Sequence, residues 1–276
     1  SPNGHGGSLK ALWTRGAIAD MKQRGVEQIS YTQVDNPIVR MVDPLFLGLH
    51  ALDGAQMSSK MLPKAFAKEK LGNFCLADGK MTVIEYSNLP DALAEQTTDS
   101  GELRFRAGSI ALHSIRVDFV ESINTSAEGF SLPFNRAEKK VKFYDESAGQ
   151  TVTPDRPNAV KLETFVFDAL PRCDASIIYE TDRVDEFAPI KNADTPGSGG
   201  QVETDSPASS KQIQTERAAR WLESHGVQVA RDPGSGAGLG RVQATIEIKQ
   251  TTAIYPEDLA GLDLPAEVTT GQEVLL

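Results

Sequence analysis

Apolar residues recur along this chain at two spacings, one typical of helices and the other of strands. From Leu9 to Met21 they follow the helical spacing, which predicts one helix over residues 8–24, closed by Gly25. Short apolar runs that end at turn residues predict strands. By these criteria we expect strands at 29–34, 57–62, 71–76, 81–86, 104–113 and 176–180, and helices at 44–52, 89–95, 159–170 and 209–225.

The alternation of helices and strands indicates an α/β fold. Asp78 and Gly79 between two strands predict a tight hairpin turn. A Gly/Ser/Pro-rich stretch at 195–210 predicts a flexible loop, which divides the chain into a core of residues 1–194 and a smaller domain of residues 211–276. A strand expected at 242–248 makes that C-terminal domain β-rich. The glycine-rich stretch 232–240 is predicted to be a loop and not a dinucleotide site, because no helix follows it.

Composition narrows the classes of function. The formal net charge of −10 argues against a general nucleic-acid binder, which needs surplus Lys and Arg, although it leaves room for a local basic pocket. No apolar stretch reaches the length of a membrane span and no signal peptide is visible, so we expect a cytoplasmic protein that binds no membrane. Cys75 and Cys173 lie in apolar runs and are expected to be small buried residues.

Two polar segments carry candidate chemistry. Residues 1–7 form a glycine-rich loop before a helix, and an apolar strand ends at Asp35 and Asn36. Glycines allow close backbone approach to a ligand, and an Asp at the carboxyl end of a strand can hold a divalent cation. The pair therefore suggests a nucleotide or sugar-phosphate site, with an N-cap as the alternative for Asp35. Such a loop follows a strand in known folds, so we expect a segment of the same protein before Ser1.

Six ordered blocks extend this pattern: residues 1–7, 33–37, 83–87, 104–110, 161–168 and 186–194. Together they resemble the eukaryote-type UDP-sugar pyrophosphorylases, most of all the UDP-N-acetylglucosamine pyrophosphorylases. The resemblance implies a partial Rossmann-like (GT-A-like) nucleotidyltransferase core with a smaller C-terminal domain. It also implies a reaction in which UTP and a sugar 1-phosphate give a UDP-sugar and pyrophosphate with Mg²⁺, and in which positioning and charge neutralisation supply most of the catalysis.

The resemblance also assigns roles to individual residues. Asp35 is the expected magnesium ligand and Lys191 the expected catalytic residue, because an ammonium suits the charge on the transferring phosphoryl group. Phe165 and Phe167 match aromatics that line an N-acetyl pocket. The full set of expected substrate-binding residues is Gly4, His5, Gly6, Asn36, Glu85, Tyr86, Gly108, Ser109, Phe165 and Phe167.

Each assignment has a structural alternative. Spacing alone favours core positions for Phe165 and Phe167, and a solvated strand residue is the alternative for Glu85. Lys191 has a surface lysine as its alternative. Lys60 and Lys64 are expected to be solvated lysines, with added positive potential at the site as their alternative.

The choice of sugar stays open, because His5 and Ser109 stand where the acetylglucosamine enzymes usually have Asn. The family's Gly-X-Gly-Thr-Arg-Leu loop, which wraps the UTP phosphates, does not occur in these residues, so we expect this chain to be inactive or nearly so by itself. Three hypotheses follow. The chain is part of a UDP-N-acetylglucosamine pyrophosphorylase, of an enzyme for the 1-phosphate of glucose, galactose or N-acetylgalactosamine, or of a non-catalytic sugar-nucleotide-binding module.

Overall fold

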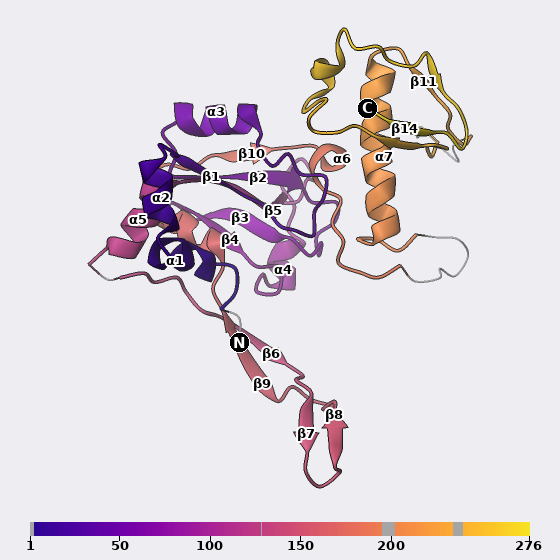
Figure 1. Ribbon diagram of the computed structural model, residues 1–276. Helices are drawn as coiled ribbons and strands as arrows, with labels where there is room; N and C mark the ends of the chain where they lie inside the picture. Colours follow the sequence, from indigo (N-terminus) through magenta and orange to yellow (C-terminus); the bar gives the residue numbers. More distant parts are fainter. Residues whose placement is uncertain (1–2, 128, 195–201, 234–239) are drawn as a thin grey trace. The chain divides into compact units, whose positions relative to one another are not determined.

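A computed structural model of the chain describes residues 3–127, 129–194, 202–233 and 240–276 (Figure 1). It contains two compact units, both built from discontinuous segments. Unit 1 comprises residues 1–30, 48–59 and 64–178, and unit 2 comprises residues 31–47, 60–63 and 179–276. The boundaries expected at 194 and 210 stay a prediction. Much of the predicted flexible loop, residues 195–201, lies outside the described residues, as do residues 234–239 of the second glycine-rich stretch.

A six-stranded sheet is the framework of the described residues, in the order β10-β2-β5-β3-β4 with β1 paired to β5. Strand β3 runs antiparallel to β4 and to β5. Asp78 and Gly79 have φ angles of 51° and 75°, so the predicted hairpin turn is confirmed. The strands of this sheet are β1 (Gln28–Tyr31), β2 (Met57–Pro63), β3 (Gly72–Ala77), β4 (Lys80–Ile84), β5 (Ala107–Arg116) and β10 (Ile178–Glu180).

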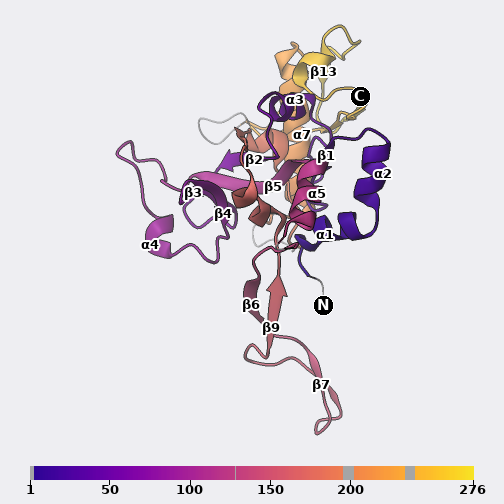
Figure 2. The same ribbon diagram turned by 90° about the vertical axis from the view of Figure 1, so that its left-hand side faces the viewer.

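Helices α1 (Gly7–Thr14), α2 (Ala17–Gln23) and α5 (Val117–Thr125) lie together on one side of β5, and α4 (Asp91–Ala94) lies on the other (Figure 2). The prediction of one helix over residues 8–24 is wrong. Gly16 has a φ angle of 80°, a left-handed conformation that ends α1 and turns the chain into α2. Helix α3 (Pro44–Leu52) confirms the prediction at 44–52.

The prediction of a helix over 159–170 is also wrong. Residues of β9 (Ala159–Glu163) pair antiparallel with β6 (Asn135–Lys139), and a 3₁₀ helix, η1 (Val166–Arg172), follows. The apolar residues of this segment fit a two-residue period as well as a helical one, and the partner strand decides between them. A second hairpin, β7 (Phe143–Asp145) with β8 (Gln150–Val152), continues from this pair away from the sheet of unit 1 (Figures 1 and 2).

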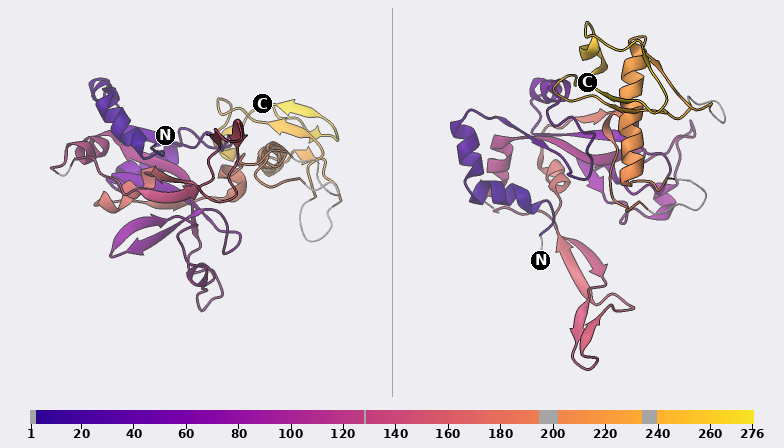
Figure 3. Two further views of the ribbon diagram at one scale, coloured as in Figure 1. Left: turned by 90° about the horizontal axis from the view of Figure 1, so that it is seen from below. Right: turned by 45° about the vertical axis from the view of Figure 1, so that its right-hand side comes forward.

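Unit 2 is built around α7 (Pro207–Ser224), which lies along short paired strands (Figure 3). Its core joins Trp221 and Leu222 of the helix to Ile246, Leu259 and Val268. The remaining elements of unit 2 are α6 (Arg183–Glu186), β11 (Gln228–Val229), β12 (Thr245–Glu247), η3 (Pro256–Leu259), β13 (Glu267–Val268) and β14 (Glu273–Leu275). Among the described residues, no helix combines the length and the apolar character that a membrane crossing requires.

Candidate functional site

The glycine-rich loop of residues 3–7 packs against the chain that follows β9. Gly6 N–H donates to the carbonyl oxygen of Thr164 at 2.8 Å, and Thr164 N–H donates to Asn3 O at 3.0 Å. A Cβ atom on Gly4 would lie 2.4 Å from Thr164 O, and one on Gly6 would lie 2.7 Å from Thr164 C. Close contact with the protein's own backbone therefore requires both glycines. Ser1 and Pro2 lie outside the described residues.

This contact places His5 against both predicted pocket phenylalanines. Its ring stacks on Phe165 with 5.0 Å between centroids and meets Phe167 edge-on at 5.7 Å. Val166 N–H donates to His5 Nδ1 at 3.1 Å, so the neutral ring carries its proton on Nε2. Burial lowers the pKa of His5, and the charge of Glu163 opposes that shift. Three predicted site residues thus form one aromatic wall with a neutral imidazole.

Two other predicted blocks lie at neighbouring strands of unit 1. Glu85 directly follows β4 and is half-buried, whereas Tyr86 is 46% exposed. Gly108 and Ser109 are buried near the start of β5, where Ser109 pairs with Gly72 of β3. The Glu85 block therefore lies at the end of β4 and the Gly108–Ser109 block on β5. These two strands pair with β3.

In unit 2 the segment of Asp35 and Asn36 is joined to the segment that leads to Lys191. Ile190 N–H donates to Asp35 O at 2.7 Å. The Asn36 side chain donates to Glu186 O at 2.8 Å and accepts from Ala188 N–H at 2.9 Å. Since Asn36 is only 3% exposed and both ends of its amide are used, its evident role is to hold the two segments together. Its contact with sugar or ribose hydroxyls stays a prediction.

Lys191 is exposed on this joined segment, with Nζ 5.6 Å from the centroid of the Phe187 ring. Its backbone N–H and that of Asn192 both donate to Asp205 O, at 2.7 and 2.8 Å. The backbone at Lys191 is therefore fixed while its ammonium faces solvent, a suitable arrangement for meeting a phosphate.

The carboxylate of Asp35 fits the requirements of Mg²⁺. It is half-buried, and within the described residues it has no side-chain hydrogen bond or ion pair. Across the same part of the chain, no group of three His, Cys, Asp or Glu side chains could hold a metal. Mg²⁺ usually takes one or two carboxylates and completes its shell with water and substrate phosphates, so a single Asp is sufficient.

A buried ion network in unit 2 was missed by the sequence reasoning. Lys60 is 2% exposed and donates to Asp43 at 2.5 Å and to Glu186 at 2.7 Å. Arg40 donates to the same Glu186 oxygen at 2.5 Å. The expectation of solvated lysines at 60 and 64 is wrong, because both are buried, Lys64 at 8% exposure. A lysine inside the apolar run 57–62 needs buried partners, and this was the available signal.

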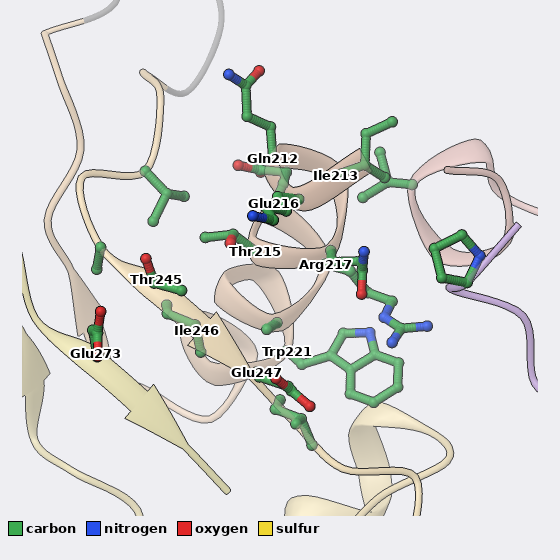
Figure 4. Close-up of a pocket in the computed structure, with 18 of the residues that line it drawn as sticks. Gln212, Ile213, Thr215, Glu216, Arg217, Trp221, Thr245, Ile246, Glu247 and Glu273 are labelled. Atoms are coloured by element: carbon green, nitrogen blue, oxygen red, sulfur yellow. The ribbon is translucent and has the colours of Figure 1, made fainter. Parts of the chain in front are cut away.

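A cavity of about 930 Å³ runs along α7 and β12 in unit 2 (Figure 4). Arg217, Trp221, Ile246 and Glu247 are among its lining residues. None of the predicted site residues among the described part of the chain lines it. The candidate residues therefore form two separate groups, the aromatic wall in unit 1 and the joined Asp35 and Lys191 segments in unit 2.

Comparison with known proteins decides the family. The pattern of the UTP–glucose-1-phosphate uridylyltransferase family matches residues 1–195. The chain belongs to this family. The matched range contains every residue expected at the uridylyltransferase site, from Gly4 to Lys191, so the resemblance that the six blocks indicated is confirmed.

Relatives in this uridylyltransferase family are named for N-acetylated sugars. UDP-N-acetylhexosamine pyrophosphorylase-like protein 1 of Mus musculus is 36% identical over 242 residues, which cover 85% of this chain and 46% of that protein. UDP-N-acetylglucosamine pyrophosphorylase of Saccharomyces cerevisiae is 33% identical, over 83% of this chain and 47% of its own length. The chain thus spans about half the length of these relatives.

Solved structures confirm the nucleotidyltransferase fold. A provisionally named UDP-N-acetylglucosamine pyrophosphorylase of Entamoeba histolytica matches with a TM-score of 0.77 and 27% identity, covering 100% of this chain and 62% of that one. The UDP-N-acetylglucosamine pyrophosphorylase of Trypanosoma brucei matches with a TM-score of 0.68 and 22% identity, over 92% of this chain and 50% of its own.

Proposed function

We propose that the whole protein containing this chain is a uridylyltransferase for an N-acetylhexosamine 1-phosphate, N-acetylglucosamine 1-phosphate first. A phosphate oxygen of the sugar 1-phosphate attacks the α-phosphorus of UTP, a new P–O bond forms, and pyrophosphate leaves. The observation that carries the proposal is the hydrogen bond from Ile190 N–H to Asp35 O, because it joins the candidate magnesium ligand to the segment of the candidate phosphate-binding lysine.

Each side chain contributes through position or charge in this proposal. The Lys191 ammonium binds the phosphate groups and offsets the negative charge that develops during transfer. Asp35 would hold magnesium, which supplies further charge neutralisation on the phosphates when bound. Magnesium, UTP and the cytoplasm as the site of reaction are parts of this proposal. This chain spans about half the length of its relatives, and we propose that it has little activity by itself.

The aromatic wall favours an N-acetylated sugar over plain glucose. The half-buried rings of Phe165 and neutral His5 pack with the buried Phe167 and offer apolar surface that suits a methyl group better than a hydroxyl. The names of the mouse and yeast relatives agree with this choice. One observation favours a different sugar. Ser109, which stands where the acetylglucosamine enzymes usually have Asn, is only 8% exposed and has a shorter side chain than Asn.

The test measures pyrophosphate release by the full-length protein with UTP, Mg²⁺ and the 1-phosphates of N-acetylglucosamine, N-acetylgalactosamine and glucose in turn. We expect N-acetylglucosamine 1-phosphate to react fastest. Lys191→Ala should lower kcat/KM by about 10²- to 10³-fold, since a charge that stabilises the transferring phosphoryl group is removed. No reaction with any sugar would favour the non-catalytic binding module.

Lys249→Ala is the matched control, because Lys249 is another exposed lysine of unit 2. It should leave kcat/KM unchanged within about twofold, as expected for a surface charge outside the site. Equal losses in the two variants would show that Lys191 acts only through the overall charge of the protein.

A further inference from the structure

A buried lysine of unit 1 is tied to the strands that carry two of the predicted sugar-contact blocks. Lys64 directly follows β2 and is 8% exposed. Its Nζ donates to Ala67 O at 2.6 Å and to Asn73 Oδ1 at 2.8 Å, so both acceptors are neutral. Its backbone N–H donates to Arg106 O at 2.8 Å, just before β5.

Asn73 on β3 connects Lys64 to the strands on both sides of β3. It is fully buried, and its Nδ2 donates to Leu71 O and Ile84 O, both at 3.2 Å. In the ladder Asn73 lies opposite Ile84 on β4 and Gly108 on β5. Ile84 immediately precedes Glu85. The Asn73 amide therefore holds the chain beside the Glu85 block, and the Asn73 backbone lies in register with Gly108 of the other block.

Gly72, the residue before Asn73, lies close to Ser109. A Cβ on Gly72, which pairs with Ser109, would lie 2.7 Å from Val83 Cγ1 and 3.6 Å from Ser109 Cβ. The side chains of Val83 on β4 and Ser109 on β5 thus lie beside the position that a side chain on residue 72 would occupy, and glycine leaves that position open.

The energetics of Lys64 do not favour a purely stabilising role. Burying an ammonium with neutral acceptors costs free energy, and an apolar side chain of similar volume avoids that cost. Burial lowers the pKa of Lys64, with the charge of Glu69 opposing the shift. Buried charged residues that lack a charged partner are exceptions to the usual burial pattern, and such exceptions are found mainly at functional sites.

We propose that Lys64 is a positioning residue that acts through Asn73 to hold the Glu85 block and the Gly108–Ser109 block at the separation that binds the sugar 1-phosphate. This inference rests on the proposed function. It predicts that loss of Lys64 weakens the binding of the sugar 1-phosphate and spares that of UTP.

The experiment compares Lys64→Met with wild-type full-length protein in the pyrophosphate assay, with the two KM values measured separately and thermal unfolding recorded. We expect the KM for the sugar 1-phosphate to rise at least about tenfold, since small misplacements of binding groups have effects of this size. The KM for UTP should stay within about twofold. Lys68→Met is the control, because Lys68 lies in the same loop but is exposed and paired with Asp91 and Glu95.

If Lys64→Met fails to fold, the double variant Lys64→Met/Asn73→Leu decides, because it removes both side chains of the Lys64–Asn73 hydrogen bond, so that neither is left buried without the other. A folded variant with wild-type KM values, or with both KM values raised equally, overturns the positioning role and leaves the proposed function intact. A wild-type protein that neither reacts with nor binds any sugar 1-phosphate overturns both proposals together.

Discussion

Gly4 and Gly25 have nearly equal positive φ angles, +72° and +69°, but different surroundings. A Cβ on Gly4 would meet the backbone of Thr164, whereas one on Gly25 has no described atom within 4 Å. Alanine at Gly25 should therefore show the energetic cost of the left-handed conformation alone, and alanine at Gly4 should show that cost together with the cost of a steric clash.

We predict that Gly25→Ala lowers the free energy of unfolding by about 1 to 2 kcal/mol, the cost of a left-handed alanine. Gly4→Ala should lower it by at least about 3 kcal/mol, because the clash adds to that cost. Chemical denaturation of both variants measures the difference. Equal losses would mean that the loop of residues 3–7 moves away from Thr164 at little cost.

At the scale of elements, strand β2 shows how a charged residue is accommodated in an apolar run. Lys60 is buried between two carboxylates and close to Arg40, which shares Glu186 with it. Removing the lysine leaves an excess of buried negative charge at Asp43 and Glu186, and that is more costly than losing an exposed pair.

We predict that Lys60→Met destabilises the protein by about 3 to 5 kcal/mol, as expected when one partner of a buried ion network is lost. Lys68→Met, which breaks only exposed pairs, should have a far smaller effect on the free energy of unfolding. Urea unfolding of both variants tests the contrast. A loss for Lys60→Met as small as that for Lys68→Met would show that water enters and solvates the two carboxylates.

The segment 159–170 shows where reasoning about elements failed. Periodicity describes one face of an isolated segment, and a short apolar run fits a helix or a strand equally well. Pairing with β6 converted the first half into β9, and that pairing depends on residues 20 to 28 positions earlier in the chain. The turn at Asp78 and Gly79 was predicted correctly, because its conformation is set by those two residues alone.

For the whole molecule, buried histidines link stability to pH. Burial, and to a lesser extent the charge of nearby His5, lowers the pKa of His113 from 6.5 to about 3. His113 shares a hydrogen bond with Ser59 at 2.8 Å. The folded state therefore resists protonation that the unfolded state accepts.

Since the folded pKa lies below the unfolded value, the contribution of His113 to stability is complete above pH 6.5 and is lost as the pH falls toward 3. The loss approaches about 5 kcal/mol at the lower end, at roughly 1.36 kcal/mol per unit. Unfolding free energies of wild type and His113→Asn between pH 4 and 8 test this. We expect a shallower slope in the variant, and identical slopes would contradict the assignment.

The sequence by itself determined the α/β alternation, the strands around 57–62 and 71–76, the hairpin turn and the family. These features follow from local periodicity, from turn residues and from short ordered blocks, so each can be recognised without knowledge of distant contacts. The prediction that Phe165 and Phe167 line an N-acetyl pocket also came from such a block. The structure shows that both rings pack against His5, and their contact with a sugar stays a prediction.

Only the tertiary structure decided which distant segments meet. It brought Gly4 and Gly6 against Thr164, joined Asp35 to Ile190, and buried Lys60 and Lys64 among partners that no local pattern indicates. The physical reason is that such contacts depend on the register of whole strands and on the combined burial of many residues, whereas local spacing specifies only which face of an element is apolar.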